Sequence, residues 1–158
     1  SSQELSSIII SAKKNYNNYK KNPATKTFQA IRIFVNKELT ELIKGLTEAT
    51  KILSNDGILI VVSFHSLEDK IVKNFFNLYS NATKNPSRYF PITEKKNNLF
   101  KSFLKKPYIP ESKEIRQNNR SRSAKLRYAI RNNNTFYSPI EFNNKFSNYL
   151  KLEEGILW

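Results

Sequence analysis

The sequence predicts an α/β fold built around one buried parallel strand, and two observations support this prediction. Residues 58–64, ILIVVSF, are almost all apolar and mostly β-branched, and the run is too short for a helix. An apolar run without polar alternation is typical of a strand that is buried on both faces, as in a parallel sheet. Helical patterns stand on both sides of this run in the sequence, which is the element order of an α/β unit.

Two helices are expected before the strand. Apolar residues at helical spacing predict a short amphipathic helix over residues 4–14 and a long helix over residues 27–53. Thr25 is placed to cap the long helix, and Gly57 is expected to end it in the left-handed conformation. The polar residues 15–21 predict a loop between the two helices.

A third helix follows the strand directly. Ser66 can cap its free amides, while Glu68 and Asp69 complement the positive end of the helix dipole. Ser63, His65 and Ser66 therefore stand at the carboxyl end of a parallel strand, where open α/β sheets bind their ligands. The face expected to lie on the sheet carries Ile71, Val72, Phe75, Phe76 and Tyr79.

Beyond this helix the chain is polar and basic. Residues 80–98 predict a loop, residues 99–104 a weak strand, residues 112–117 a short helix and residues 124–130 a clear strand. The tail, 132–158, has no clear strand pattern, and it is either a docked extension or poorly ordered. Two or three strands are too few for a parallel sheet covered on both faces, so we expect further strands before the first residue.

The composition narrows the classes of function. The 158 residues suffice for one domain or for a piece of a larger one. The absence of cysteine excludes a disulfide framework, a thiol nucleophile and a cysteine-ligated metal, and the single histidine argues against any other metal site. No apolar run approaches the ~20 residues of a membrane helix, so we expect a cytoplasmic protein without a membrane partner. The absence of methionine and an opening within a helical pattern predict a fragment that lacks its beginning.

The positive charge is concentrated in one segment. Of the net charge of +14, residues 84–131 contribute 14 basic and only 3 acidic side chains. Such clustering favours RNA or DNA as a partner, against the alternatives of a solvated basic face or a biased composition. Arg120 and Arg122 stand at the entrance of the last strand, where forked guanidinium groups suit phosphate. Lys26 and Arg32 could hold phosphate near the start of the long helix, and a solvated helix end is an equally open alternative.

Several catalytic sites are excluded by spacing. Ser63, His65 and Glu68 are too close in sequence to form a hydrolase triad, and no G-x-S-x-G elbow is present. Three glycines in the whole chain cannot supply a dinucleotide fingerprint or a P-loop. Position alone favours a structural role for His65 at the end of its strand.

Three motifs occur in order and carry a family resemblance: NPATKTFQAIRI at 22–33, SFHSLEDKIVK at 63–73 and NNRSRSAKLR at 118–127. Over residues 1–131 the chain closely resembles the C-terminal half of the ribosomal RNA small subunit methyltransferase H family. The resemblance implies the C-terminal half of a class I (Rossmann-like) S-adenosylmethionine-dependent methyltransferase, with the end of an inserted helical domain. It implies three parts, which are the end of the insertion (1–21), part of the methyltransferase domain (22–131) and an extension of unknown role (132–158).

The resemblance also implies an activity. The family transfers a methyl group from S-adenosylmethionine to the N4 amine of a cytidine in the decoding region of 16S rRNA, within the small ribosomal subunit. We expect His65 and Ser63 to face the cavity that the cofactor shares with the target cytidine. The residues expected to bind the substrate are Ser66, Lys26, Arg32, Arg120 and Arg122.

The chain departs from the family pattern in several places. Asn22 stands where the family usually has histidine, Lys26 where it usually has arginine, and Asn119 where proline is common. The family's glycine-rich cofactor loop has no counterpart in this sequence, so most of the cofactor site is expected outside it and the fragment alone is expected to be inactive. A basic RNA-binding module and an inactive remnant remain the alternatives.

Overall fold

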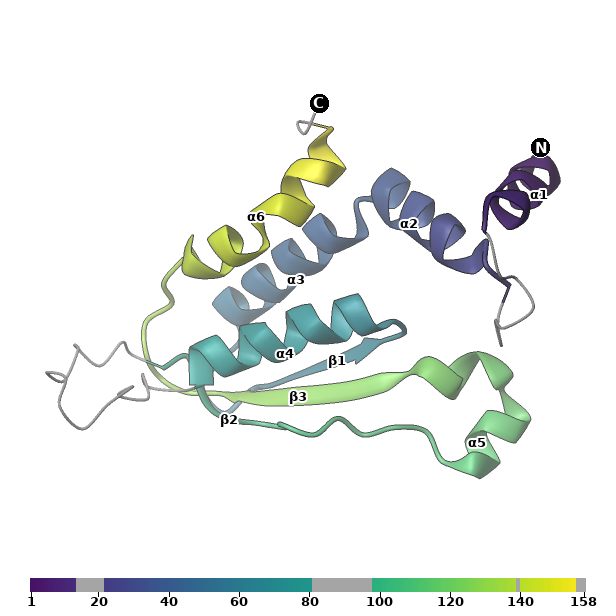
Figure 1. The fold of residues 1–158 in the computed structure, drawn as a ribbon. Coiled ribbons are helices and arrows are strands. Elements are labelled where there is room, and N and C mark those ends of the chain that lie inside the picture. Colours follow the sequence, from purple (N-terminus) through teal and green to yellow (C-terminus); the bar gives the residue numbers. More distant parts are fainter. Residues whose placement is uncertain (14–21, 81–97, 139, 156–158) are drawn as a thin grey trace, which may run out of the picture. The chain divides into compact units, whose positions relative to one another are not determined.

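The computed structural model describes residues 1–13, 22–138 apart from 81–97, and 140–155, so the predicted loops at 15–21 and 80–98 lie almost entirely outside the described residues. The chain divides into two compact units, Ser1–Glu41 with Asn148–Trp158, and Leu42–Ser147. Figure 1 shows the elements in chain order: α1 (Ser2–Ala12), α2 (Thr25–Asn36), α3 (Glu38–Ile52), β1 (Ile58–Ser63), α4 (Ser66–Ser80), β2 (Phe100–Phe103), α5 (Ser112–Gln117), the 3-10 helix η2 (Asn119–Ser123), β3 (Lys125–Arg131) and α6 (Ile140–Glu154).

The second unit is a mixed α/β unit with a small antiparallel sheet. Its strand order is β1-β3-β2, and β3 pairs with both neighbours in the antiparallel direction. The register of β1 on β3 runs from Ile58 opposite Ile130 to Ser63 opposite Lys125. The predicted strands at 58–64, 99–104 and 124–130 are therefore confirmed within a residue or two. The parallel neighbours expected for β1 are not found among the described strands.

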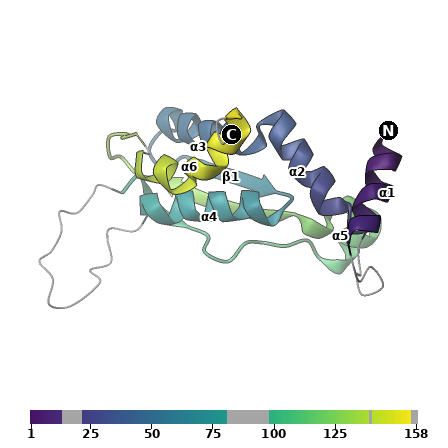
Figure 2. The same cartoon turned by 45° about the horizontal axis from the view of Figure 1, so that its top comes forward.

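The prediction that β1 is buried on both faces is wrong. Ile58, Ile60 and Val62 are 54%, 59% and 49% exposed, and they alternate with residues that are more covered. Among the described residues of this unit, α4 covers the opposite face of the sheet and runs along it in both views (Figures 1 and 2). The apolar run therefore reflects a strand with one covered face and one open apolar face.

The core of the second unit lies between α4 and the sheet. The predicted apolar face of α4 is confirmed, since Ile71, Val72, Phe75, Phe76 and Tyr79 are all buried. The aromatic rings of this face meet other rings edge to face. The centroid of the Phe76 ring lies 5.4 Å from that of Phe100 in β2. Edge-to-face pairs of this kind add specificity to the burial of large apolar area.

Of the two alternatives for the tail, a docked extension or a poorly ordered segment, the structure shows the docked extension. Residues 140–154 form α6, and in the second unit Phe142 and Phe146 are 1% and 2% exposed. The Phe142 ring lies 5.2 Å from that of Phe75 on α4, at an interplanar angle of 85°. Phe142, Phe146 and Leu150 recur four residues apart, which is a helical spacing, so the sequence held a signal for this helix that a search for a strand pattern missed.

The long helix predicted over 27–53 is two helices. Lys37 adopts the left-handed conformation, with φ of 51°, and separates α2 from α3. The apolar pattern continues across this break, so periodicity could not reveal it. Thr25 does not act as the cap of α2. Ala24 holds that position, and its amide donates to the side-chain oxygen of Asn22 at 2.9 Å.

The turn before β1 also differs from the prediction. Asp56, with φ of 62°, takes the left-handed conformation in place of Gly57. Asp tolerates this region better than most side chains. Gly57 is required for space, because a Cβ there would lie 2.6 Å from Cγ of Leu53.

None of the helices in the described part of the chain has the length and apolar character that a membrane crossing requires.

Candidate functional site

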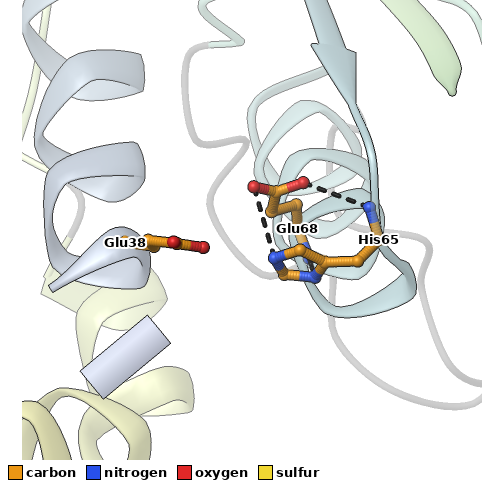
Figure 3. Close-up of side chains that lie close together, drawn as sticks. All are labelled: Glu38, His65 and Glu68. Atoms are coloured by element: carbon orange, nitrogen blue, oxygen red, sulfur yellow. Dashed lines mark hydrogen bonds and ion pairs between the residues drawn. The ribbon is translucent and has the colours of Figure 1, made fainter. Parts of the chain in front are cut away.

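His65 is the cap of α4, a role that the sequence assigned to Ser66. The Glu68 amide donates to His65 Nδ1 at 3.2 Å, and Glu68 Oε2 accepts from the amides of Phe64 and His65 at 2.8 Å and 3.2 Å. This reciprocal arrangement is a capping box with histidine in the place of serine or threonine. Figure 3 shows the His65 ring lying against the Glu68 carboxylate. Ser66 is the first residue of the helix, and it is exposed.

The capping contacts fix the His65 imidazole. Because Nδ1 accepts a hydrogen bond, the neutral ring carries its proton on Nε2. Nε2 lies 3.3 Å from Glu68 Oε1, and only 8% of the side chain is exposed. The ring therefore has a defined tautomer and orientation at the carboxyl end of β1. This geometry suits a hydrogen bond donor and leaves no acceptor nitrogen for a general base.

Ser63 lies on the covered face of the sheet. It is 4% exposed, and its hydroxyl donates to the Lys125 carbonyl at 3.4 Å. Ser63 and His65 are therefore brought to the same end of β1, as the sequence predicts, but the serine hydroxyl faces β3. Among the described residues no basic side chain forms a hydrogen bond with this hydroxyl, so none of them activates it as a nucleophile.

A buried ion cluster lies beside this strand end, and sequence reasoning did not find it. Asp69 of α4 accepts from Arg127 Nε at 2.7 Å and from Lys125 Nζ at 3.1 Å, and both cations belong to β3. Burial alone would raise the pKa of Asp69, but the hydrogen bonds and charges of Arg127 and Lys125 outweigh it and hold that pKa below its ordinary value. The cluster fixes the first turn of α4 to β3.

Arg127 extends the cluster to the segment after β2. Its Nη1 donates to the Leu104 carbonyl at 3.2 Å and to the Lys105 carbonyl at 2.6 Å. Arg127 is only 3% exposed. Its guanidinium group joins three parts of the second unit, namely α4, β3 and the segment after β2. The motif at 118–127 contains Arg127, but the sequence assigned a role there only to Arg120 and Arg122, as phosphate contacts.

Five of the six cations between β2 and β3 form what we call the basic strip. All five are exposed, and their side chains form no ion pair or hydrogen bond with the residues that the structure describes. They belong to the segment after β2, to α5 and to η2, which leads directly into the start of β3. The members of the basic strip are Lys105, Lys106, Arg116, Arg120 and Arg122.

The two cations expected at the start of the long helix differ. Both belong to the first unit. Arg32 donates to Glu38 through Nε and Nη2 at 2.7 Å and 3.0 Å, so its guanidinium group bridges the break between α2 and α3. Lys26 is exposed in the first turn of α2. The sequence did not predict that Glu38 would bind Arg32. Glu38 follows Lys37, whose left-handed conformation is visible only in the structure.

The described residues do not fit a complete S-adenosylmethionine site. Gly45 lies within α3 and is exposed, Gly57 packs against Leu53, and Gly155 follows α6. None of these positions forms a backbone cradle of the kind that a nucleoside cofactor occupies.

The comparisons with known proteins agree with one another. A family model described as the MraW methylase family matches residues 1–132. Proteins named ribosomal RNA small subunit methyltransferase H are similar to this chain. The one from Ruegeria sp. (strain TM1040) is 43% identical over 84% of this chain and 40% of its own length. The one from Rickettsia rickettsii (strain Sheila Smith) is 48% identical over 77% and 40%, and the one from Nitrobacter hamburgensis is 51% identical over 70% and 33%. The chain thus spans about two fifths or less of these relatives.

Proposed function

The chain belongs to the MraW methylase family, and from this premise we propose that it is a fragment of an rRNA methyltransferase that binds the RNA substrate. The complete protein would transfer a methyl group from S-adenosylmethionine to the N4 amine of a cytidine in the decoding region of 16S rRNA. Its place of action would be the small ribosomal subunit in the cytoplasm. The relatives named ribosomal RNA small subunit methyltransferase H support the reaction class.

The observation that carries the proposal is the contrast between two sets of cations. Lys125 and Arg127 are paired with Asp69, and Lys101 is paired with Asp56. The five cations of the basic strip remain exposed without such partners among the described residues. Unneutralised cations concentrated in the one segment between β2 and β3 favour a polyanionic ligand, and RNA fits both this charge and the family.

The strand end beside the basic strip would hold the target base. The ring of His65 has a fixed orientation at this end, where its Nδ1 accepts from the Glu68 amide and its Nε2 lies 3.3 Å from Glu68 Oε1. We propose that His65 helps to fix a flipped-out cytidine and that Ser63 shapes the same wall. Ser66, Arg120, Arg122 and, in the other unit, Lys26 and Arg32 are proposed as substrate-binding residues, although Arg32 is already engaged by Glu38.

Methyl transfer to an aromatic amine depends mainly on positioning. The N4 lone pair is delocalised into the ring, so the amine must be aimed at the methyl group, and correct placement accounts for much of the rate. A capped and ion-paired strand end is a rigid support for that placement. The methylated amine can release its extra proton to water, so the proposal requires no general base.

The fold proposal is that of the C-terminal half of a class I methyltransferase. The open apolar face of β1 and its unpaired edge in the described residues support the addition of further strands and a second covering layer. Residues 1–21 would be the end of an inserted helical domain, residues 22–131 the methyltransferase part and residues 132–158 an extension. The comparison covers residues 1–132, so α6 lies outside the family model.

A chimera tests the enzymatic proposal. Residues 1–132 would replace the matching part of the Ruegeria relative, and methyl incorporation would be measured on small ribosomal subunits that lack the modification. We expect transfer by the chimera, and loss of most of it when Arg120 and Arg122 are both changed to alanine. The unmodified relative is the positive control. A folded chimera without transfer that still binds RNA would favour an RNA-binding module, and one that binds no RNA would favour an inactive remnant.

A further inference from the structure

Tyr108 presents an exposed aromatic ring close in sequence to two cations of the basic strip, Lys105 and Lys106. The ring-bearing residue is 62% exposed, and it stands two residues after Lys106 in the segment that follows β2. An exposed aromatic ring among cations is the combination that proteins binding single-stranded nucleic acid use. Neither the predicted phosphate contacts nor the proposed base pocket accounts for this ring.

The backbone of Tyr108 is rigid. Its amide donates to the Leu126 carbonyl at 3.0 Å, and the Leu126 amide donates to its carbonyl at 2.9 Å, which forms an isolated antiparallel bridge to β3. Pro107 and Pro110 restrict the chain on both sides. The two bridge hydrogen bonds and the two prolines fix the backbone that carries the ring, so little backbone entropy is lost when the ring makes a contact.

The bridge also places Tyr108 at the end of the sheet where β1 leads to His65. Leu126 is opposite Val62 in β1, so Tyr108, Leu126 and Val62 form one row across the sheet. Val62 in this row directly precedes Ser63, at the carboxyl end of β1, and His65 just beyond it caps α4. Arg122 precedes Leu126 by four residues, a chain distance of at most about 14 Å.

We propose that Tyr108 is a stacking platform for an unpaired base of the RNA strand that the basic strip holds. Phosphate contacts from Lys and Arg fix the backbone of a single strand, while an aromatic ring between them takes the face of a base. The proposal rests on the RNA-binding function proposed above. It assigns Tyr108 a role in affinity for single-stranded RNA that is independent of charge.

RNA binding by Tyr108 variants of the 158-residue chain tests this inference. The probes are a short single-stranded RNA oligonucleotide, the same oligonucleotide with abasic positions, and the duplex of the same sequence. Tyr108→Leu should lower affinity for the single strand by about tenfold, while Tyr108→Phe and Tyr108→Trp retain it. The loss should nearly vanish on abasic RNA and on the duplex, and the salt dependence of binding should stay unchanged, because no charge is removed.

The matched control is Ile109→Ala, which removes a neighbouring apolar side chain that is 69% exposed and has no aromatic face. This control should bind the single strand as the unmodified chain does. A Tyr108→Leu protein that keeps full affinity while the Arg120→Ala, Arg122→Ala protein loses it would overturn the stacking role and leave the RNA-binding proposal intact. Absence of RNA binding by the unmodified chain would overturn both.

Discussion

The carboxylate of Asp69 on α4 holds the guanidinium group of Arg127 on β3 through two hydrogen bonds, from Nε to Oδ1 at 2.7 Å and from Nη2 to Oδ2 at 3.3 Å. The two residues are 8% and 3% exposed. Asp69→Asn should lower the free energy of unfolding by about 3–5 kcal/mol, because it leaves a buried guanidinium group without a counter-charge. Urea unfolding of the 158-residue chain measures this loss.

Asp56→Asn is the control for that change. Asp56 also pairs with a lysine, Lys101, but the two side chains are 64% and 45% exposed. Asn accepts the left-handed conformation that Asp56 adopts, so we expect a loss below about 1 kcal/mol. Equal losses for the two variants would mean that burial adds nothing to the Asp69 pair.

The lowered pKa of Asp69 makes its contribution depend on pH. In the folded state this pKa lies below its ordinary value, so the carboxylate stabilises the fold at pH values above the unfolded-state pKa of about 3.9. The stabilisation is lost as the pH falls through the folded-state pKa. The difference in unfolding free energy between the unmodified chain and Asp69→Asn should therefore shrink on acidification below about pH 4, which urea titrations at several pH values would reveal. A difference that does not depend on pH would contradict the assignment.

His65 has a capping role and a proposed catalytic role, and two substitutions separate them. His65→Asn keeps a good cap, so its stability should stay within about 1 kcal/mol of the unmodified chain, whereas His65→Ala should lose about 1 kcal/mol or more. In the active chimera, His65→Asn should lower methyl transfer by about tenfold, the effect of one positioning contact. Near-normal transfer by a stable His65→Asn chimera would return the residue to the capping role alone.

The sequence predicted the helices and strands of the second unit better than it predicted which of their faces are covered. The strand at 58–64 was recognised because its apolar run is short and β-branched, and α4 because its apolar residues recur at helical spacing. Which faces are covered was not predictable, since the same run fits a strand with two covered faces or one. The break at Lys37 was hidden because the apolar period continues through it.

The candidate site was predicted as a location and not as a set of contacts. Ser63 and His65 were correctly placed at the end of β1, because strand direction follows from the order of elements. The cap on α4 was given to Ser66, since serine is the usual cap and histidine rarely is. The pairing of Asp69 with Arg127 joins residues 58 positions apart, and no local pattern reports such a contact.

Glu153 in the tail supports the start of α3 within the first unit. Its carboxylate is buried and accepts from the amides of Leu39 and Thr40 at 3.0 Å and 2.9 Å, and from the Thr40 hydroxyl at 2.6 Å. Glu153→Gln should lower the free energy of unfolding by about 1.5–3 kcal/mol, because hydrogen bonds to a charged group are lost. The neighbouring Glu154 is exposed, so Glu154→Gln should change it by less than about 0.5 kcal/mol. Equal effects would refute the capping role of the tail.

The salt dependence of RNA binding tests the central claim most directly. The measurement is the slope of log affinity against log salt for a single-stranded RNA and the 158-residue chain. Each phosphate contact on single-stranded RNA contributes about 0.7 to this slope, so the Arg120→Ala, Arg122→Ala protein should lose about 1.4. The control is the Lys70→Ala, Lys73→Ala protein, which removes two exposed cations from α4 and should keep the slope of the unmodified chain. Equal slopes for all three proteins would contradict the claim, because the charge of the basic strip would then reflect composition and not an RNA-binding surface.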